Sequence, residues 1–232
     1  MTIDSSLLND VLTKASRLLD KLESSQNPIK NLPLEKDSFA LRWCKTKGIT
    51  SIKWKCPISR DNLLHIDRQA KLLLDNTQQF VEGFSANNAL LWGSRGTGKS
   101  SLIQAVLATF NHQQLRVIEI NHNDFSDWPD IVHWIKFQHP QKFILFCDDL
   151  SFNEDDASYK EIKAALDGSL TSLPENALIY ATSNRRHLLP EKLVDNQHAQ
   201  HINGEIHHAE AIEEAISLSD RFGLWLSCLL YT

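Results

Sequence analysis

The amino-acid sequence predicts an α/β protein whose parallel sheet is covered by helices on both faces. From residue 61 onward, short apolar segments alternate with segments of helical periodicity, which is typical of βαβ units. Segments such as FILFCDD (143–149) are apolar at most positions, as expected for strands buried on both faces. Three of the eight glycines lie within residues 93–98, between an apolar segment and a helical one. The 42% hydrophobic and 23% charged residues are typical of a soluble globular protein.

Residues 1–60 are expected to form an N-terminal extension. Apolar residues in 5–23 are spaced for one face of a helix, and Pro28 and Pro33 prevent that helix from continuing. From Arg42 to Arg60 the chain carries six basic residues, no acidic residue and two tryptophans. Two interpretations stay open: a weak nucleic-acid contact, or a small strand pair with core tryptophans and solvated lysines. The net charge of −5 argues against a wholesale nucleic-acid or membrane binder.

Residues 61–232 are predicted to form the α/β core. Its helices are expected at 61–83, 99–110, 126–137, 159–170 and about 209–218, and its strands at 89–92, 115–120, 143–149, 176–183 and 222–226. Each strand except the last is followed by a helix, so the strands are expected to run parallel.

The segment GSRGTGKS (93–100) fits the phosphate-binding pattern GxxxxGK[ST] and lies between a predicted strand and a predicted helix. Glycines let backbone N–H groups turn toward phosphate oxygens, and the helix N-terminus adds positive potential. Lys99 is expected to reach the β- and γ-phosphates, and Ser100 to bind Mg²⁺. The alternatives are a glycine turn with a surface lysine, or a dinucleotide site, whose GxGxxG pattern is absent. The predicted nucleotide-binding residues, called the phosphate loop below, are Gly93, Ser94, Arg95, Gly96, Thr97, Gly98, Lys99, Ser100 and Ser101.

Polar side chains follow three further segments. Asp148 and Asp149 end the strand FILFCDD, and the carboxyl ends of parallel strands open into one crevice. Asp148 is expected to hold Mg²⁺ and Asp149 to deprotonate the attacking water. The alternative is that both are solvated acids at the end of a strand. The acids at 154–156 are competing candidates for the base. Asn184 follows the next strand and can bond a γ-phosphate or the water; alone it also fits a turn residue. Arg221 can stabilise transition-state charge; the alternatives are a surface ion pair with Asp220 or a helix cap.

In this order the motifs resemble those of the AAA+ ATPases: the phosphate loop, the Walker B strand FILFCDD, the sensor-1 strand IYATSN and the arginine-finger box SDRF. LLWGSRGTGKSSL, FCDDLSF, ATSNRRHL and SLSDRFGLWL are closer still to an uncharacterised bacterial AAA+ family, a domain of unknown function. The resemblance implies a three-layer P-loop NTPase core with five parallel strands in the order 5-1-4-3-2. It also implies ATP and Mg²⁺ as ligands, Asn184 as sensor 1, and a ring or helical homo-oligomer in which Arg221 reaches the ATP of a neighbouring subunit.

The sequence departs from the AAA+ pattern at two places. Asp149 stands where most members have glutamate, which is one methylene longer, and this suggests slower hydrolysis or a differently placed water. The chain ends six residues after FGLWL, so the helical lid with its sensor-2 arginine is expected to be missing. Weaker nucleotide binding and impaired hydrolysis are expected to follow.

The predicted function is an Mg²⁺-dependent ATP hydrolase that remodels an unidentified macromolecule. The alternative is a nucleotide-gated switch or helicase-loader-like adaptor that binds DNA or protein with little hydrolysis, with Arg42–Arg60 as its contact surface. A cytoplasmic location without membrane contact is expected, because the sequence shows neither a secretory signal nor an apolar run of roughly 18 residues. Four scattered cysteines predict no zinc site or disulfide framework. The histidines at 198, 201, 207 and 208 are expected in a polar loop rather than at a metal.

Overall fold

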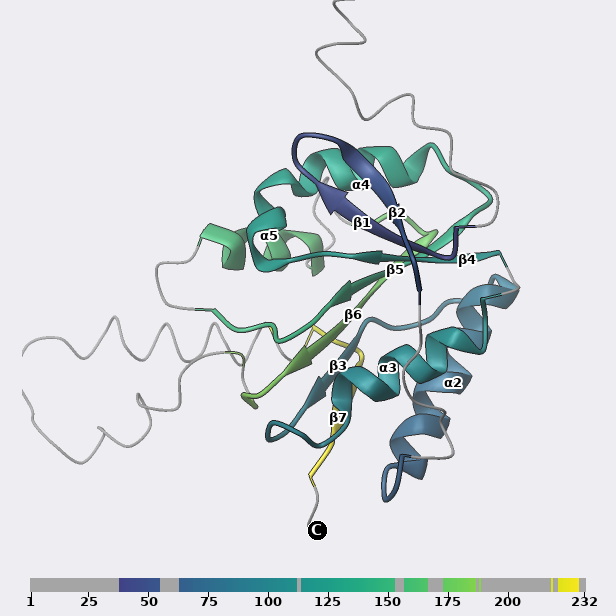
Figure 1. The fold of residues 1–232 in the computed structure, drawn as a ribbon, viewed down its shortest axis with the longest axis vertical. Coiled ribbons are helices and arrows are strands. Elements are labelled where there is room, and N and C mark those ends of the chain that lie inside the picture. Colours follow the sequence, from purple (N-terminus) through teal and green to yellow (C-terminus); the bar gives the residue numbers. More distant parts are fainter. Residues whose placement is uncertain are drawn as a thin grey trace, which may run out of the picture.

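The structure, a computed structural model, describes residues 38–54, 63–111, 114–152, 157–166, 173–186, 188, 218 and 221–229. Strands and helices alternate along the core as predicted (Figure 1). In chain order the elements are β1 (Ala40–Cys44), β2 (Gly48–Ile52), α2 (Asp67–Glu82), β3 (Ala89–Trp92), α3 (Lys99–Ala108), β4 (Leu115–Glu119), the 3-10 helix η3 (His122–Asp127), α4 (Trp128–Lys136), β5 (Lys142–Cys147), α5 (Ala157–Leu166), β6 (Ala177–Ser183) and β7 (Leu224–Ser227). The predicted helix at 5–23, the histidine-rich loop and all but the last residue of the predicted helix at 209–218 lie outside the described residues.

The sheet has seven strands in the order β2-β1-β4-β5-β6-β3-β7. The predicted number of five strands is therefore wrong. Five adjacent strands, β7-β3-β6-β5-β4, are all parallel, and numbered among themselves they follow the order 5-1-4-3-2. The two additional strands come from the segment expected in the N-terminal extension: β1 pairs parallel with β4, and β2 pairs antiparallel with β1.

Strands β1 and β2 join the sheet because their apolar side chains pack into its core. Trp43 is 2% exposed, and its indole N–H donates to Asp127 over 3.0 Å. Arg42 donates to Glu119 on β4, and Lys45 lies 3.3 Å from the other oxygen of Asp127. The first half of the basic segment is thus a strand pair with a core tryptophan. Residues 55–60, the end of that segment, lie outside the described residues.

Helices cover both faces of the sheet, which gives the predicted three layers (Figure 1). One core lies between the sheet and α4, η3 and α5, and it contains Trp128 and Trp134. The other lies between the sheet and helices α2 and α3. On that second face the buried Tyr180 hydroxyl bonds Asn76 at 2.9 Å and Thr77 at 2.8 Å, which ties β6 to α2.

The topology brings the carboxyl ends of β5, β6 and β3 together, because these parallel strands are direct neighbours. The phosphate loop follows β3, the acidic pair follows β5, and Asn184 follows β6. Ligands of open α/β sheets bind at this edge. Within the described part of the chain, no helix is long and apolar enough to cross a membrane.

Candidate functional site

The phosphate loop leaves β3 and enters α3 through three glycines with positive φ. The φ angles are 149° at Gly93, 80° at Gly96 and 83° at Gly98, a range that residues with a Cβ rarely adopt. Gly98 is the N-cap of α3, so the helix begins at Lys99 with its N-terminus facing the loop. The loop is also closed on itself, because the Thr97 hydroxyl donates to the Ser94 carbonyl over 2.9 Å.

Gly93 has a further reason to lack a side chain. A Cβ at this position would lie 2.4 Å from the carbonyl oxygen of Cys228 and 3.0 Å from its carbon. The Cys228 N–H in turn donates to the carbonyl of Trp92 over 2.8 Å. The chain just beyond β7 therefore packs directly on the start of the phosphate loop.

Lys99 is a buried cation whose ammonium group is held by neutral oxygens. The residue is 6% exposed, and Nζ donates to the carbonyls of Gly93 (2.7 Å) and Ser94 (2.8 Å) and to Oδ1 of Asn184 (3.0 Å). An ammonium has three donors, so all of them are used and none bonds a carboxylate. Burial lowers the pKa of Lys99, while nearby Cys228, Asp149 and Asp148 act in the opposite direction. An anion that replaced one of the neutral acceptors would bind here favourably.

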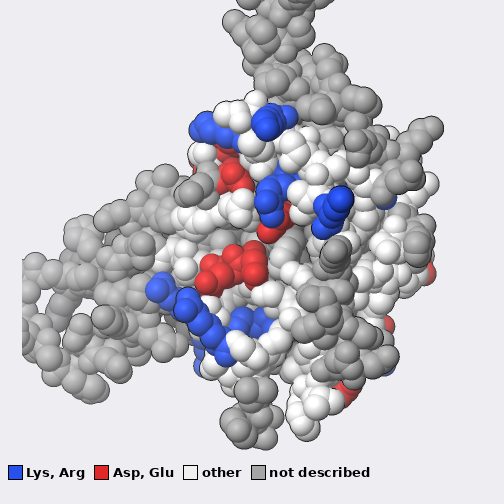
Figure 2. All heavy atoms as spheres, in the orientation of Figure 1, with Lys and Arg blue, Asp and Glu red and all other residues white. Residues whose placement is uncertain are grey.

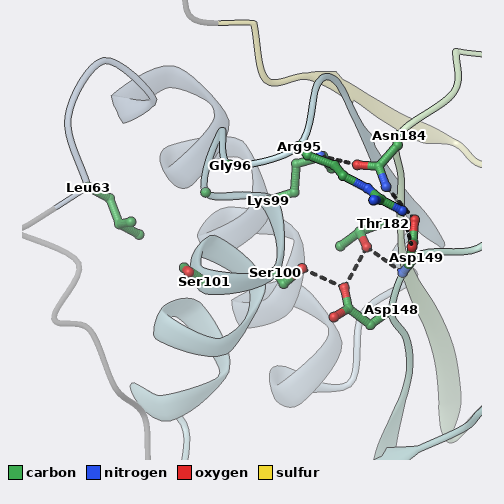
Figure 3. A pocket seen from close by; sticks show the side chains of 11 residues that line it. Leu63, Arg95, Gly96, Lys99, Ser100, Ser101, Asp148, Asp149, Thr182 and Asn184 are labelled. Atoms are coloured by element: carbon green, nitrogen blue, oxygen red, sulfur yellow. Dashed lines mark hydrogen bonds and ion pairs between the residues drawn. The ribbon is translucent and has the colours of Figure 1, made fainter.

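Two hydroxyl groups converge on Asp148. Oγ of Ser100 and Oγ1 of Thr182 both donate to Oδ1 of Asp148, over 2.5 Å and 2.6 Å (Figure 3). Thr182 also accepts the backbone N–H of Asp149 over 2.9 Å. The start of α3, the end of β5 and the end of β6 are thereby joined through one carboxylate and two hydroxyl groups.

Asp149 adopts a left-handed backbone conformation with φ of 53°. Aspartate tolerates this region better than most residues with a side chain. Nδ2 of Asn184 donates to Oδ1 of Asp149 over 2.5 Å, and Nη2 of Arg95 lies 3.8 Å from Oδ2. Asn184 therefore bridges Asp149 and Lys99 through the two ends of its amide (Figure 3).

These side chains surround one pocket of about 470 Å³. It is lined by Leu63, Arg95, Gly96, Gly98, Lys99, Ser100, Ser101, Asp148, Asp149, Thr182 and Asn184. Figure 2 shows acidic side chains gathered at the centre of this face with basic side chains on either side of them. The structure thus brings the predicted lysine, serine, two acids and asparagine to one place. Gly93, Ser94 and Thr97 belong to the loop but do not line the pocket.

Two lining residues, Leu63 and Thr182, were not predicted. Leu63 was expected inside a helix at 61–83, but His65 has φ of 65° and α2 begins only at Asp67. Leu63 therefore precedes the helix and lies against the loop, 3.6 Å from the position that a Cβ on Gly98 would take. Thr182 lies on β6, two residues before Asn184, which follows the strand, and this proximity in the sequence was the available signal.

Arg221 does not line the pocket. It precedes β7, and the first residue of β7 pairs with Ala89, the first residue of β3. The phosphate loop follows the opposite end of β3, about 13 Å away for four strand residues. Arg186, past Asn184, lies over the rings of Trp92 and Trp225, at 5.4 Å and 5.5 Å from their centroids.

A family model, described as a protein of unknown function (DUF815), matches residues 36–231. Comparison with curated protein sequences gives no match. The chain is similar to the RuvB Holliday junction branch migration motor of Thermotoga maritima at 18% identity and a TM-score of 0.41, over 74% of this chain and 47% of that one. It is also similar to DnaI at 14% identity and a TM-score of 0.46, over 83% of this chain and 95% of that one. It is also similar to Orc1 of Aeropyrum pernix in complex with DNA, at 13% identity and a TM-score of 0.49, over 72% of this chain and 46% of that one.

The chain spans about half the length of the RuvB and Orc1 structures, at 47% and 46%. The match of the family model agrees with the predicted resemblance to an uncharacterised family, a domain of unknown function. The family model covers nearly all of the chain beyond residue 35, including every described element. The chain belongs to the family described as protein of unknown function (DUF815).

Proposed function

We propose that the chain binds ATP with Mg²⁺ in this pocket and hydrolyses it, as the energy source for acting on a macromolecule. The observation that carries the proposal is Lys99: a buried ammonium with three neutral acceptors, at the start of a helix and facing two carboxylates. A buried cation without a bonded carboxylate is costly unless an anion completes its environment. The positive-φ glycines of the loop supply backbone N–H groups for the same anion.

Binding of a triphosphate requires Lys99 to exchange one acceptor for a phosphate oxygen. Two of its acceptors are backbone carbonyls of the phosphate loop, whereas the third is the side chain of Asn184. The side chain can rotate away without moving the loop, so Asn184 is the acceptor expected to leave. Because the same amide holds Asp149, phosphate binding and the position of Asp149 are linked.

The donor set at Ser100 and Asp148 fits Mg²⁺. A hydroxyl and a carboxylate oxygen lie together at the pocket, and Mg²⁺ takes oxygen ligands, usually one or two carboxylates with water and phosphate oxygens. The described residues contain no cluster of three or more His, Cys, Asp or Glu side chains for a metal. When bound, Mg²⁺ supplies positive charge that stabilises the phosphate oxygens.

Asp149 is the residue proposed to activate water. Its side chain is 56% exposed at the pocket, so a water molecule can reach it. The water oxygen would bond to the γ-phosphorus while its proton passes to Asp149, and the bond from phosphorus to the bridging oxygen would break to give ADP and phosphate. In this structure both oxygens of Asp149 are engaged, by Asn184 and by Arg95. An ionised carboxylate has about four acceptor sites, so Asp149 can accept a hydrogen bond from water while these contacts persist.

Arg221 is proposed to act on the nucleotide of a neighbouring copy. Its place before β7, at the edge of the sheet opposite its own phosphate loop, supports action between subunits over action within one. A ring or helical homo-oligomer would place the arginine of one subunit against the pocket of the next. Shared sites make the rate per subunit depend on assembly.

Binding of ATP to the Lys99→Ala variant tests the proposal. The wild type is expected to bind a fluorescent ATP analogue in the presence of Mg²⁺, and Lys99→Ala to lose that binding because it removes the buried cation. Lys142→Ala is a matched control, since burial also lowers the pKa of Lys142 but this residue begins β5, at the edge of the sheet opposite the pocket. Undiminished binding by Lys99→Ala, or equal losses in both variants, would contradict the proposal.

The described half of the basic segment does not favour the DNA-binding alternative. Arg42 and Lys45 lie within ion-pair distance of Glu119 and Asp127, and Trp43 is buried in the core. These contacts give Arg42, Trp43 and Lys45 roles within the fold itself.

A further inference from the structure

The hydroxyl group of Thr182 contacts both acidic residues of the candidate site. Thr182 is 1% exposed and lies on β6, which pairs with β5 up to the residue before Asp148. Its carbonyl accepts the N–H of Leu150 over 2.7 Å. The turn that carries Asp148 and Asp149 is thus attached to this one threonine by backbone and side chain together.

The direction of each hydrogen bond at this hydroxyl is fixed by chemistry. The backbone N–H of Asp149 can only donate, so Oγ1 of Thr182 accepts it over 2.9 Å. An ionised carboxylate can only accept, so the single hydroxyl proton is donated to Oδ1 of Asp148 over 2.6 Å. One group therefore holds the side chain of the first acid and the backbone of the second.

We propose that Thr182 is a positioning residue that orients Asp148 for metal binding and Asp149 for water activation at the same time. The inference rests on the proposed ATPase function. The bond to Asp148 aims its carboxylate toward Ser100, which donates to the same oxygen. The bond from the Asp149 N–H holds that residue at φ of 53°, where its side chain meets Asn184. Without the hydroxyl of Thr182, the side chain of Asp148 and the backbone of Asp149 each lose one orienting hydrogen bond, although neither aspartate is itself replaced.

A purely structural role for Thr182 is the competing explanation, because a buried hydroxyl on a strand also contributes to stability. The two explanations differ in what they predict for Mg²⁺. A structural role changes the unfolding temperature but leaves the Mg²⁺ dependence of a folded variant unaltered. A positioning role changes the Mg²⁺ dependence and the turnover number, while the affinity for ATP in the presence of EDTA stays near that of the wild type, because the phosphate loop and Lys99 do not bond Thr182.

The test compares Thr182→Val, which keeps the shape and removes the hydroxyl, with Thr182→Ser, which keeps the hydroxyl. Thr77→Val is the matched control: Thr77 is similarly buried, on α2, and its hydroxyl bonds Leu73 and Tyr180 rather than an acid. Loss of a hydrogen bond to a charged group corresponds to about a 10- to 100-fold effect. Thr182→Val is expected to raise the Mg²⁺ concentration for half-maximal ATP hydrolysis by about tenfold or more and to lower kcat. Thr182→Ser and Thr77→Val should remain near wild type.

Circular dichroism and thermal unfolding establish that each variant is folded, and Thr182→Ala replaces Thr182→Val if the valine variant does not fold. The inference is overturned if the folded variant without the hydroxyl keeps the wild-type Mg²⁺ dependence, or if Thr182→Ser shows the same defect. A wild-type chain that neither binds nor hydrolyses ATP would instead overturn the proposed function, and the inference with it. The wild-type measurement alone separates these two failures.

Discussion

Replacing Gly93 by alanine is expected to destabilise the fold more than the same change at Gly96, although both glycines belong to the phosphate loop. Both have positive φ, a sparsely populated conformation that costs a residue with a Cβ about 1–3 kcal/mol. Only at Gly93 would the new carbon lie 2.4 Å from a backbone oxygen, that of Cys228, whereas nothing lies within 4 Å at Gly96. Overpacking of this kind typically costs about 1–3 kcal/mol. That range is the expected difference in unfolding free energy between the variants.

Thermal unfolding by circular dichroism measures this difference without nucleotide. For a protein of this size, 1 kcal/mol corresponds to about 2–4 °C in Tm, so Gly93→Ala should melt roughly 2–12 °C below Gly96→Ala. Urea unfolding of both variants gives the free energies directly. Equal stabilities would refute the reasoning that the chain after β7 presses on the start of the loop. Phosphate binding alone would then explain the glycine.

Three further predictions concern single side chains. Tyr180→Phe should lower the unfolding free energy by about 1–2 kcal/mol in urea titrations, because the buried hydroxyl that ties β6 to α2 is lost; an unchanged midpoint would contradict this. Burial lowers the pKa of Lys99 below the ordinary value of 10.5, so ATP affinity should fall as the pH rises through this lowered pKa. Above it, the neutral amine of Lys99 must take up a proton before it can bind the phosphate. A Kd for ATP that stays constant until pH 10.5 would speak against this. Alkylation at about pH 8, near the ordinary thiol pKa, should modify Cys44 before Cys228, as followed by mass spectrometry. Hydrogen bonds from Thr46 lower the pKa of Cys44, whereas burial raises the pKa of Cys228 to about 11. The reverse order of reaction would contradict the described environments.

Local patterns in the sequence were sufficient to predict the core of the fold. Strands such as β5 and β6 are continuous apolar runs, and the spacing of apolar residues predicted the helices between them. The number of strands was wrong because β1 and β2 were not placed in this sheet, although a small strand pair was one interpretation of their segment. Their place in the sheet depends on partners far along the chain, such as Glu119 for Arg42 and Asp127 for Trp43. Pairing over such separations leaves no periodic signal in either segment.

The candidate site was predictable where a motif fixes the backbone and unpredictable where a contact depends on the fold. The pattern GxxxxGK[ST] placed Lys99 and Ser100, and the ends of two strands placed Asp148 and Asn184. No sequence pattern indicated that Asp149 adopts a left-handed conformation, which aspartate tolerates better than most residues with a side chain. The double contact of Thr182 and the close approach of Cys228 to the phosphate loop likewise arise from segments that meet only in the folded chain.

Phosphate release from ATP, measured over a range of protein concentrations, tests the central claim most directly. The wild-type rate per subunit should rise with protein concentration, because Arg221 is proposed to complete the site of a neighbouring copy. Asp149→Asn and Arg221→Ala should each bind ATP but release phosphate only at the background rate, and an equimolar mixture of the two should recover part of the wild-type rate. A wild type without phosphate release at any concentration, or an Asp149→Asn variant as active as the wild type, would contradict the claim that this pocket is an ATP hydrolysis site.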